Sequence, residues 1–352
     1  VIQADAWDLL EETAAAAPDL LIGGPPCKSF SLAGTRAPGD TRGGLVRCCL
    51  EHVSVSRPAA FALENVPGIL SARRPLLDLG PEEDLVLAWS DEFQQLHSRR
   101  MSLSHTNRDS PEEVQAEIEE ITEKQEILKT NLEAYLEPVV DQIYEISRGL
   151  GYEVTHRTLD AADYGTPQHR KRVFFVGVDP ERAAYRWPST TYFRPSSLQE
   201  LLQTPAWVSA AAAIEGVRGL PSGSVPNHDY VQHSEEVVQK YAATAPGDSA
   251  SNFRGAYRRL QAERPSWTVL SNHGAIFIHY AEDRLITIRE ALTLQGFPPF
   301  PLPSEVPPEG REAGFPGWHI LSGTKAEQNE QVGNAVPPQL AQAVLGGIQF
   351  KN

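Results

Sequence analysis

The sequence is poor in cysteine and methionine and has no long apolar run. Its 352 residues hold three cysteines, Cys27, Cys48 and Cys49, too few for a disulfide framework, so we expect a reducing cytosol. No apolar stretch approaches the ~20 residues of a membrane-spanning helix, and no signal peptide opens the chain. The first residue is Val1 and the only methionine is Met101, which indicates a chain truncated or processed at its start.

Positive charge is also scarce. Lys and Arg number 31 against 46 Asp and Glu, and the formal net charge is -15. That sign is wrong for a protein that coats nucleic acid regardless of sequence, although a local basic cleft can coexist with an acidic exterior. Hydrophobic residues make up 41%, enough for a core, and the length suits one large or two ordinary domains.

One stretch joins an apolar strand to a reactive side chain. Leu20 to Ile22 predicts a buried parallel strand, and the Gly-Gly-Pro-Pro run at 23–26 ends it abruptly. Cys27 follows at the end of the strand, where open α/β sheets place their ligand crevice. An isolated cysteine is more often a small buried hydrophobe. Here the rigid turn, with Lys28 beside the thiol, favours an exposed, partly deprotonated nucleophile.

Two further apolar strands border charged groups. Residues 58–68 form an apolar run that contains Glu64 near its end, and a carboxylate there is costly to bury unless it has a task. Residues 173–178 form another, preceded by a basic array from Gln168 to Arg172. A solvated loop end would explain any one of these charges but not the whole array.

Residues 71–138 interrupt the strand and helix pattern. Ser110 and Pro111 predict a helix start, and the apolar residues that follow at helical spacing are Val114, Ile118, Ile121, Leu128, Leu132 and Tyr135. We expect a long amphipathic helix, as in one half of a helical hairpin, packed on its own domain. The basic stretch 97–100 is predicted to be a solvated loop.

Residues from about 183 to 265 lose the alternation of strands and helices and are rich in Pro, Ser and Ala. Basic and aromatic residues interleave at 254–259. The pairs Asn227-His228 and Asn272-His273 are polar candidates for ligand contact, although each alone predicts ordinary surface placement.

Five motifs occur in an order that resembles the DNA (cytosine-5) methyltransferase family. They are Gly-Pro-Pro-Cys-x-Ser-Phe-Ser around Cys27, Glu-Asn-Val from Glu64, Gln-x-Arg-x-Arg from Gln168, Arg-Glu-Ala-x-x-Leu-Gln from Arg289, and Gly-Asn-Ala-Val from Gly333. The resemblance implies an α/β fold with a Rossmann-like class I methyltransferase sheet, its N-terminal strands missing, plus a smaller, irregular target-recognition domain.

The resemblance also implies domain limits. The catalytic methyltransferase domain is expected at 1–182, with the helical insertion at about 71–138. The target-recognition domain is expected at 183–325. A closing segment, 326–352, is expected to return to the catalytic domain.

The matched residues take family roles by resemblance. In the family the loop cysteine, here Cys27, adds to C6 of a cytosine flipped out of the duplex. The Glu64 carboxyl holds N3 and the exocyclic amine of that base, Arg172 contacts its O2, and Arg170 lies near the target phosphate. The residues that match cofactor contacts are Asp5, Ala6, Pro26, Leu45, Asn334 and Val336. The residues expected on DNA are Ser31, Arg42, Gln168, Arg254 and Arg258. No metal ligand is expected, and Asp5 taken alone would indicate a helix cap.

The implied activity is methyl transfer from S-adenosylmethionine to C5 of cytosine in duplex DNA, as in restriction-modification. One alternative is a tRNA cytosine-5 methyltransferase, which would lack the long segment found here between Arg172 and Arg289. Another is a non-catalytic DNA-binding subunit of a split methyltransferase, against which the intact Cys27, Glu64 and Arg172 argue. The expected location is the bacterial cytoplasm, near the nucleoid, or the nucleus of a eukaryote.

One family motif is absent from these 352 residues. The family opens with a strand and a Phe-x-Gly-x-Gly loop for the methionine part of the cofactor, and no such motif precedes Asp5 or follows Val336. Its strand would neighbour Leu20–Ile22, so we expect that strand to have an open edge. We expect upstream sequence or a second polypeptide to supply the missing part.

Overall fold

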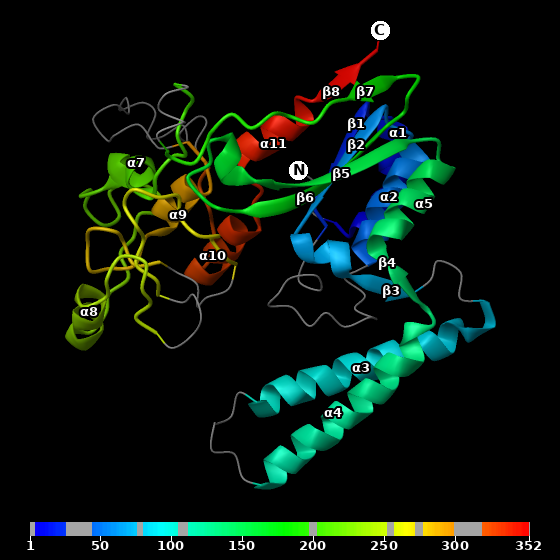
Figure 1. The fold of residues 1–352 in the computed structure, drawn as a ribbon, viewed down its shortest axis with the longest axis horizontal. Helices are drawn as coiled ribbons and strands as arrows, with labels where there is room; N and C mark the ends of the chain where they lie inside the picture. Colours follow the sequence, from blue (N-terminus) through cyan, green and yellow to red (C-terminus); the bar gives the residue numbers. More distant parts are fainter. Residues whose placement is uncertain are drawn as a thin grey trace. The chain divides into compact units, whose positions relative to one another are not determined.

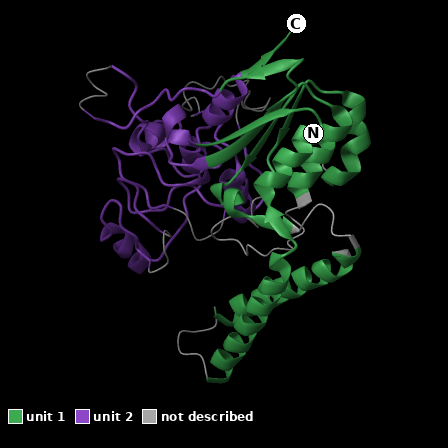
Figure 2. Cartoon of the chain, turned by 45° about the vertical axis from the view of Figure 1, so that its right-hand side comes forward, with its two compact units in different colours: residues 1–158, 172–186, 348–352 green, residues 159–171, 187–347 purple. Residues whose placement is uncertain are grey.

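The chain forms two compact units in a computed structural model (Figure 2). Unit 1 comprises residues 1–158, 172–186 and 348–352, and unit 2 comprises residues 159–171 and 187–347. The residues that the structure describes are 4–25, 44–75, 80–104, 112–196, 203–251, 257–271, 277–298 and 319–351. The two units are nearly equal in length.

Unit 1 is built on a four-stranded sheet of order β1-β2-β6-β5 (Figure 1). Its strands are β1 (Leu20–Gly23), β2 (Ala60–Asn65), β6 (Lys171–Val178) and β5 (Glu153–Asp160). β1 runs parallel to β2, and β2 runs antiparallel to β6. The C-terminal ends of β1 and β2 and the start of β6 therefore lie at the same end of the sheet, measured along the strands. The predicted strands at 20–22, 58–68 and 173–178 are confirmed.

Two helices cover one face of this sheet. They are α2 (Gly44–Ser56) and α5 (Val139–Gly149), and each turns apolar residues three or four positions apart toward the strands. The buried cluster that they form with the sheet includes Val46, Leu50, Val53, Phe61, Leu63, Ile143 and Phe175. The other elements of unit 1 near the sheet are η1 (Ala6–Leu9), α1 (Leu10–Ala16), η3 (Pro67–Ser71), and the paired β7 (Ala183–Tyr185) and β8 (Ile348–Phe350).

β1 is less buried than the sequence predicted. Its Ile22 side chain is 60% exposed, because among the described residues β1 pairs only with β2 and forms the edge of the sheet. A run of apolar residues predicts burial only when strands lie on both sides. The open edge that we expected is confirmed for the described part of the chain.

The insertion is a helical hairpin. α3 (Glu83–Ser104) and α4 (Glu112–Glu133) lie side by side (Figures 1 and 2). At its base β3 (Arg73–Pro75) pairs antiparallel with β4 (Leu136–Pro138), and η4 (Gly80–Glu82) leads into α3. The predicted helix is confirmed, and a second helix accompanies it.

Arg99 shows why the predicted loop at 97–100 is wrong. These residues lie inside α3, and Nε of Arg99 lies 2.8 Å from Oε1 of Glu117 in α4. The charges follow the outer side of a helix pair, a pattern that resembles a solvated loop when only local sequence is considered.

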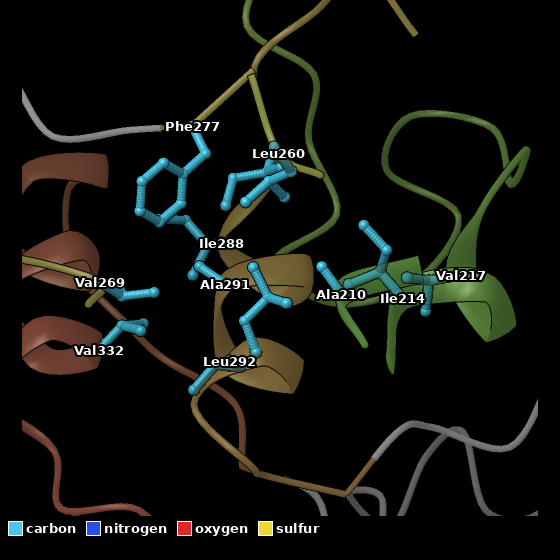
Figure 3. Packing of buried hydrophobic residues seen from close by; sticks show 12 residues of the cluster. Ala210, Ile214, Val217, Leu260, Val269, Phe277, Ile288, Ala291, Leu292 and Val332 are labelled. Atoms are coloured by element: carbon cyan, nitrogen blue, oxygen red, sulfur yellow. The ribbon is translucent and has the colours of Figure 1, made fainter. Parts of the chain in front are cut away.

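Unit 2 consists of short helices joined by irregular segments, as the lost alternation predicted. The helices are η5 (Ala161–Tyr164), α7 (Ala210–Ile214), η6 (Glu215–Val217), α8 (Glu235–Ala242), α9 (Ile288–Leu294), α10 (Lys325–Asn334) and α11 (Pro338–Leu345). Every residue of α9 is buried. Its Ala291 and Leu292 pack with Ile214 and Val332 in the core of unit 2 (Figure 3).

The closing segment has two parts. α10 and α11 belong to unit 2, where Val332 of α10 is part of the core, and residues 348–352 belong to unit 1. Residues 331–334 form the last turn of α10. α11 begins at a proline, which suits the first turn of a helix. Among the described residues, no helix is both long and apolar enough to span a membrane.

Gly177 in β6 provides a test of the sheet packing. It lies opposite Phe61, and a Cβ atom at 177 would lie 2.1 Å from Cε1 of that fully buried ring. We expect Gly177→Ala to lower the free energy of unfolding by about 1–3 kcal/mol in urea denaturation. Gly149→Ala in α5, where nothing lies within 4 Å, is the control and should leave stability unchanged or slightly raised. Equal effects of the two changes would contradict this packing.

Candidate active site

Polar groups gather at the end of the unit 1 sheet where β2 ends and β6 begins. Glu64 is opposite Phe174 in the antiparallel pair, and directly opposed residues share a face of the sheet. Arg172, two residues before Phe174, lies on that same face. The register therefore brings together two charged residues that are far apart in the sequence.

Glu64 and Arg172 form an ion pair. Nε of Arg172 lies 2.8 Å from Oε1 of Glu64, and the two side chains are only 11% and 14% exposed. Charges this sheltered are costly to leave unpaired, so the pair is held far more firmly than one on the surface. The expectation that these two residues lie close together is confirmed, whereas their roles toward a base stay predictions.

The end of β1 is tied to the same place. The Nδ2 atom of Asn65, which is 2% exposed, donates a hydrogen bond of 3.2 Å to the carbonyl oxygen of Pro25. Gly24 lies close by, since a Cβ atom there would be 4.0 Å from Oε2 of Glu64. The chain therefore leaves β1 beside Glu64, two residues before Cys27. The predicted site residues Cys27, Pro26, Ser31 and Arg42 lie outside the described residues.

Asn65 is a site residue to which the sequence analysis gave no role. Its Oδ1 accepts a hydrogen bond from the Val66 amide at 2.9 Å while its Nδ2 holds Pro25. A polar side chain at the buried end of an apolar strand needs hydrogen-bond partners. That requirement is the signal in the sequence from which a structural role for Asn65 could be inferred.

Three predicted cofactor residues lie in one region of unit 1. The Asp5 carboxylate accepts a hydrogen bond of 3.0 Å from the Trp7 amide and caps η1, as the simple helix-cap interpretation predicted. Nε2 of His52 in α2 donates to the Ala6 carbonyl oxygen at 2.8 Å. Leu45, partly buried, lies in the first turn of α2. Asp5 and Ala6 are exposed and thus accessible to a ligand.

The cysteines of α2 have the character of buried thiols. Burial, followed by the negative charges of Asp5 and Glu51, raises the pKa of Cys48. Burial, followed by the effect of Cys48, raises the pKa of Cys49 to about 11. Both side chains therefore stay protonated at neutral pH, which is unsuited to nucleophilic attack.

Gln168 and Arg170 are buried in unit 2. They are 0% and 1% exposed. Nη1 of Arg170 donates to the Val269 carbonyl oxygen at 2.8 Å and Nη2 donates to that of Gly333. Nε2 of Gln168 donates to the Leu294 carbonyl oxygen at 3.2 Å. These donors satisfy carbonyls in the interior of unit 2, and the expected contacts of the two residues with phosphate and DNA stay predictions.

Other predicted residues of unit 2 are more accessible. Asn334 is exposed at the end of α10, and Val336 is partly buried just after it. The Arg258 guanidinium lies 4.7 Å from the ring centroid of Trp267, a cation–π contact. Arg254 lies outside the described residues.

A buried charge network explains the Arg-Glu-Ala motif. Nη1 and Nη2 of Arg284 contact the fully buried carboxylate of Glu290 at 2.9 and 2.7 Å. Burial alone would raise the pKa of Glu290, but the hydrogen bonds and positive charge of Arg284 outweigh burial and lower it. Glu290 also closes a capping box with Thr287. The network therefore holds α9 inside unit 2, which is a structural role.

His228, expected at the surface, is also part of this interior. It is 0% exposed, and its Nδ1 lies 3.0 Å from Oγ1 of Thr287. Burial is the main cause that lowers the pKa of His228, so the ring stays neutral near pH 7. Surface placement of this residue is therefore wrong.

Comparison with known proteins agrees with these motifs. The family model for C-5 cytosine-specific DNA methylase matches residues 2–78 and 125–303. The chain belongs to this family. The unmatched stretch between those ranges contains α3 and the beginning of α4, so the helical hairpin is an insertion relative to the family.

Individual relatives cover almost the whole chain. Type II methyltransferase M1.HphI of Haemophilus parahaemolyticus is 25% identical over 351 residues, which span 95% of this chain and 69% of that protein. Type II methyltransferase M.DdeI of Desulfomicrobium norvegicum is 26% identical over 371 residues, which span 94% and 72%.

A solved structure shares the fold. A prophage-encoded E. coli protein, described as a DNA modification methyltransferase, aligns with a TM-score of 0.58 at 20% identity, over 98% of this chain and 84% of its own. The Rossmann-like α/β methyltransferase fold that the sequence predicted is thereby confirmed.

The Glu290 network gives a test with a defined pH dependence. Glu290→Gln keeps the shape of the side chain but removes the buried carboxylate from Arg284, which then retains Glu282 at 2.6 Å. We expect a loss of about 3 kcal/mol in the free energy of unfolding, the lower end of the cost of breaking a buried pair. Because the folded pKa of Glu290 is lowered, its stabilisation is present above the unfolded value of about 4.3. It is lost as the pH falls through the folded pKa. Urea denaturation of variant and wild type should therefore converge at low pH.

Glu236→Gln is the matched control for this test. Glu236 pairs with Lys240 at 3.3 Å but is 80% exposed, so its loss should change stability by no more than about 0.5 kcal/mol. A similar cost at both positions would show that the buried pair contributes no more than a surface pair.

Proposed function

We propose that this chain is a modification enzyme that methylates C5 of cytosine in duplex DNA, with S-adenosylmethionine as methyl donor. The observation that carries the proposal is the sheltered Glu64–Arg172 pair at the sheet edge where β1 leads toward Cys27. Membership of the C-5 cytosine-specific family supports cytosine as the target base and C5 as the methylated atom. The type II methyltransferase relatives support a restriction-modification setting.

The proposed reaction proceeds through a covalent intermediate. The Cys27 thiolate adds to C6 of a flipped cytosine. Glu64 then holds N3 and the exocyclic amine, and Arg172 holds O2. The new C6–S bond raises electron density at C5, which takes the methyl group that S-adenosylmethionine supplies when bound. Loss of the C5 proton to a base then breaks the C6–S bond and releases Cys27.

The resting geometry suits this task. Glu64 and Arg172 already lie 2.8 Å apart and largely out of water. Groups held in place before the base arrives need little reordering when charge develops on the ring. The hydrogen bond from Asn65 to Pro25 holds the start of the Cys27 segment beside the same carboxyl.

The described residues fit the adenine end of the cofactor. Asp5 offers an exposed carboxylate that can accept from an adenine amine, with the apolar Leu45 nearby in unit 1. In unit 2 the exposed Asn334 offers an amide. Within the described ranges, no glycine-rich turn with an acidic partner is present for the methionine and ribose parts.

The free edge of β1 is where we propose that the remaining cofactor site is added. Ile22 is 60% exposed there, and an edge strand with open backbone groups accepts another strand.

The architecture favours DNA over tRNA as substrate. Residues 187–347 form most of a compact unit with its own core, which is ample for a target-recognition part. A methyl-transfer assay on duplex DNA and on tRNA tests this choice. Transfer to tRNA alone would overturn it, and DNA binding without any transfer would favour a non-catalytic subunit.

Cys27→Ser tests the nucleophile. We expect turnover to fall to background and the covalent complex with 5-fluorocytosine DNA to disappear, because a hydroxyl is a much poorer nucleophile than a thiolate. Cys49→Ser is the matched control, since the raised pKa of Cys49 keeps that thiol protonated, and it should retain the complex. Near-normal activity of Cys27→Ser would refute the covalent mechanism.

Calorimetry tests the proposed cofactor site. We expect the chain alone to bind S-adenosylmethionine more weakly than micromolar, because only the adenine end finds partners. Asp5→Asn should weaken binding further, whereas Asp8→Asn, at an exposed position in the same helical turn, should not. Tight, stoichiometric binding with full methyl transfer would show that no added strand is needed.

A further inference from the structure

One buried arginine of unit 2 joins two segments that are distant in the sequence. The Arg170 guanidinium donates to the carbonyl oxygens of Val269, at 2.8 Å, and of Gly333. The first carbonyl belongs to the segment 269–271 and the second to the end of α10. With 1% of its area exposed, the planar fork joins two pieces of backbone that are distant in the sequence.

Gly333 shows how close these two pieces lie. A Cβ atom on Gly333 would lie 2.3 Å from the Ser271 amide nitrogen and 2.5 Å from the Leu270 carbonyl carbon. Backbone atoms cannot move aside cheaply, so only glycine allows this approach. The end of α10 therefore rests directly on the backbone that Arg170 also holds.

A second buried chain of hydrogen bonds reaches the same turn. Oε1 of Gln168 accepts from the Val269 amide at 3.0 Å, and its Nε2 donates to Oε1 of Gln295 at 2.6 Å. Nε2 of Gln295 donates in turn to the Ala335 carbonyl oxygen. Gln168 and Gln295 are both 0% exposed.

Asn334 lies between the two anchored carbonyls. The carbonyl of Gly333, before it, is held by Arg170, and the carbonyl of Ala335, after it, is held by Gln295. Asn334 itself is exposed. An exposed polar residue whose flanking backbone is fixed by buried donors is arranged to present its side chain in one direction.

We propose that Arg170 and Gln295 are positioning residues that orient Asn334 for the cofactor. This inference rests on the proposed function, in which Asn334 contacts S-adenosylmethionine. It assigns Arg170 a role away from the phosphate. The charge stays buried because two carbonyl oxygens accept from it, an arrangement that a lysine point charge would not reproduce with the same geometry.

The first test needs no cofactor. Hydrogen–deuterium exchange is followed for the peptide that spans 331–337 in wild type, Arg170→Lys and Gln295→Met. We expect exchange there to rise at least about tenfold in both variants while α8 is unchanged. Arg218→Lys is the control, because Arg218 is 43% exposed and contacts Glu215 and the Tyr280 ring, which lie outside the 331–337 peptide. It should exchange like wild type.

The second test separates the cofactor from DNA. In Arg170→Lys we expect KM for S-adenosylmethionine to rise about tenfold, with kcat within about twofold. Dissociation constants for duplex DNA, and their salt dependence, should stay unchanged. A lower salt slope by about one, with cofactor binding intact, would mean a phosphate contact and would overturn the proposal.

A double-mutant cycle shows whether Arg170 acts through Asn334. The effects of Arg170→Lys and Asn334→Ala on cofactor affinity should be far from additive. Additive effects would overturn the positioning role. If Arg170→Lys does not fold, the same cycle is run with Gln295→Met. If wild type binds no S-adenosylmethionine at all, the proposed cofactor role of Asn334 fails, and the exchange result still decides whether Arg170 and Gln295 fix this turn.

Discussion

The antiparallel register of β2 with β6 is the constraint on which the candidate site depends. It sets Phe174 opposite Glu64 and so places Arg172 on the same face, at the same edge. A slip of one residue would turn one of the two charges to the opposite face of the sheet. The register is itself held by packing, because Phe61 fits only where Gly177 lies opposite it.

The two units keep their charged groups in different ways. In unit 1 Glu64 and Arg172 lie near an edge and retain 14% and 11% exposure. In unit 2 Arg170, Arg289 and Glu290 are essentially fully buried. With little regular secondary structure, unit 2 has many backbone carbonyls outside helices and sheets, and buried side chains supply the donors that these carbonyls need.

Much of unit 1 could be predicted from sequence, because its signals are local. The strands at Ala60–Asn65 and Lys171–Val178 follow from apolar runs. β1 was only half predictable. Its three apolar residues indicate a strand, but exposure of Ile22 depends on whether a neighbour pairs with it, which local pattern does not encode.

Local sequence is a poor guide where contacts with a distant segment determine how a side chain is oriented. The resemblance located Gln168 and Arg170 correctly as special residues, yet their orientation depends on the carbonyls of Val269, Leu294 and Gly333, about a hundred residues or more away. Arg99 was interpreted as part of a loop because its partner Glu117 lies on the other helix.

The β3–β4 ribbon has a consequence for how this chain can vary. Pro75 and Leu136 lie opposite each other, so the chain enters and leaves the hairpin at neighbouring points, about 5 Å apart for paired strands. The geometry of the sheet therefore does not depend on the length of the segment between Pro75 and Leu136. Such a junction tolerates insertion, and a reporter domain with adjacent termini could be joined there without altering the edge that carries Glu64 and Arg172.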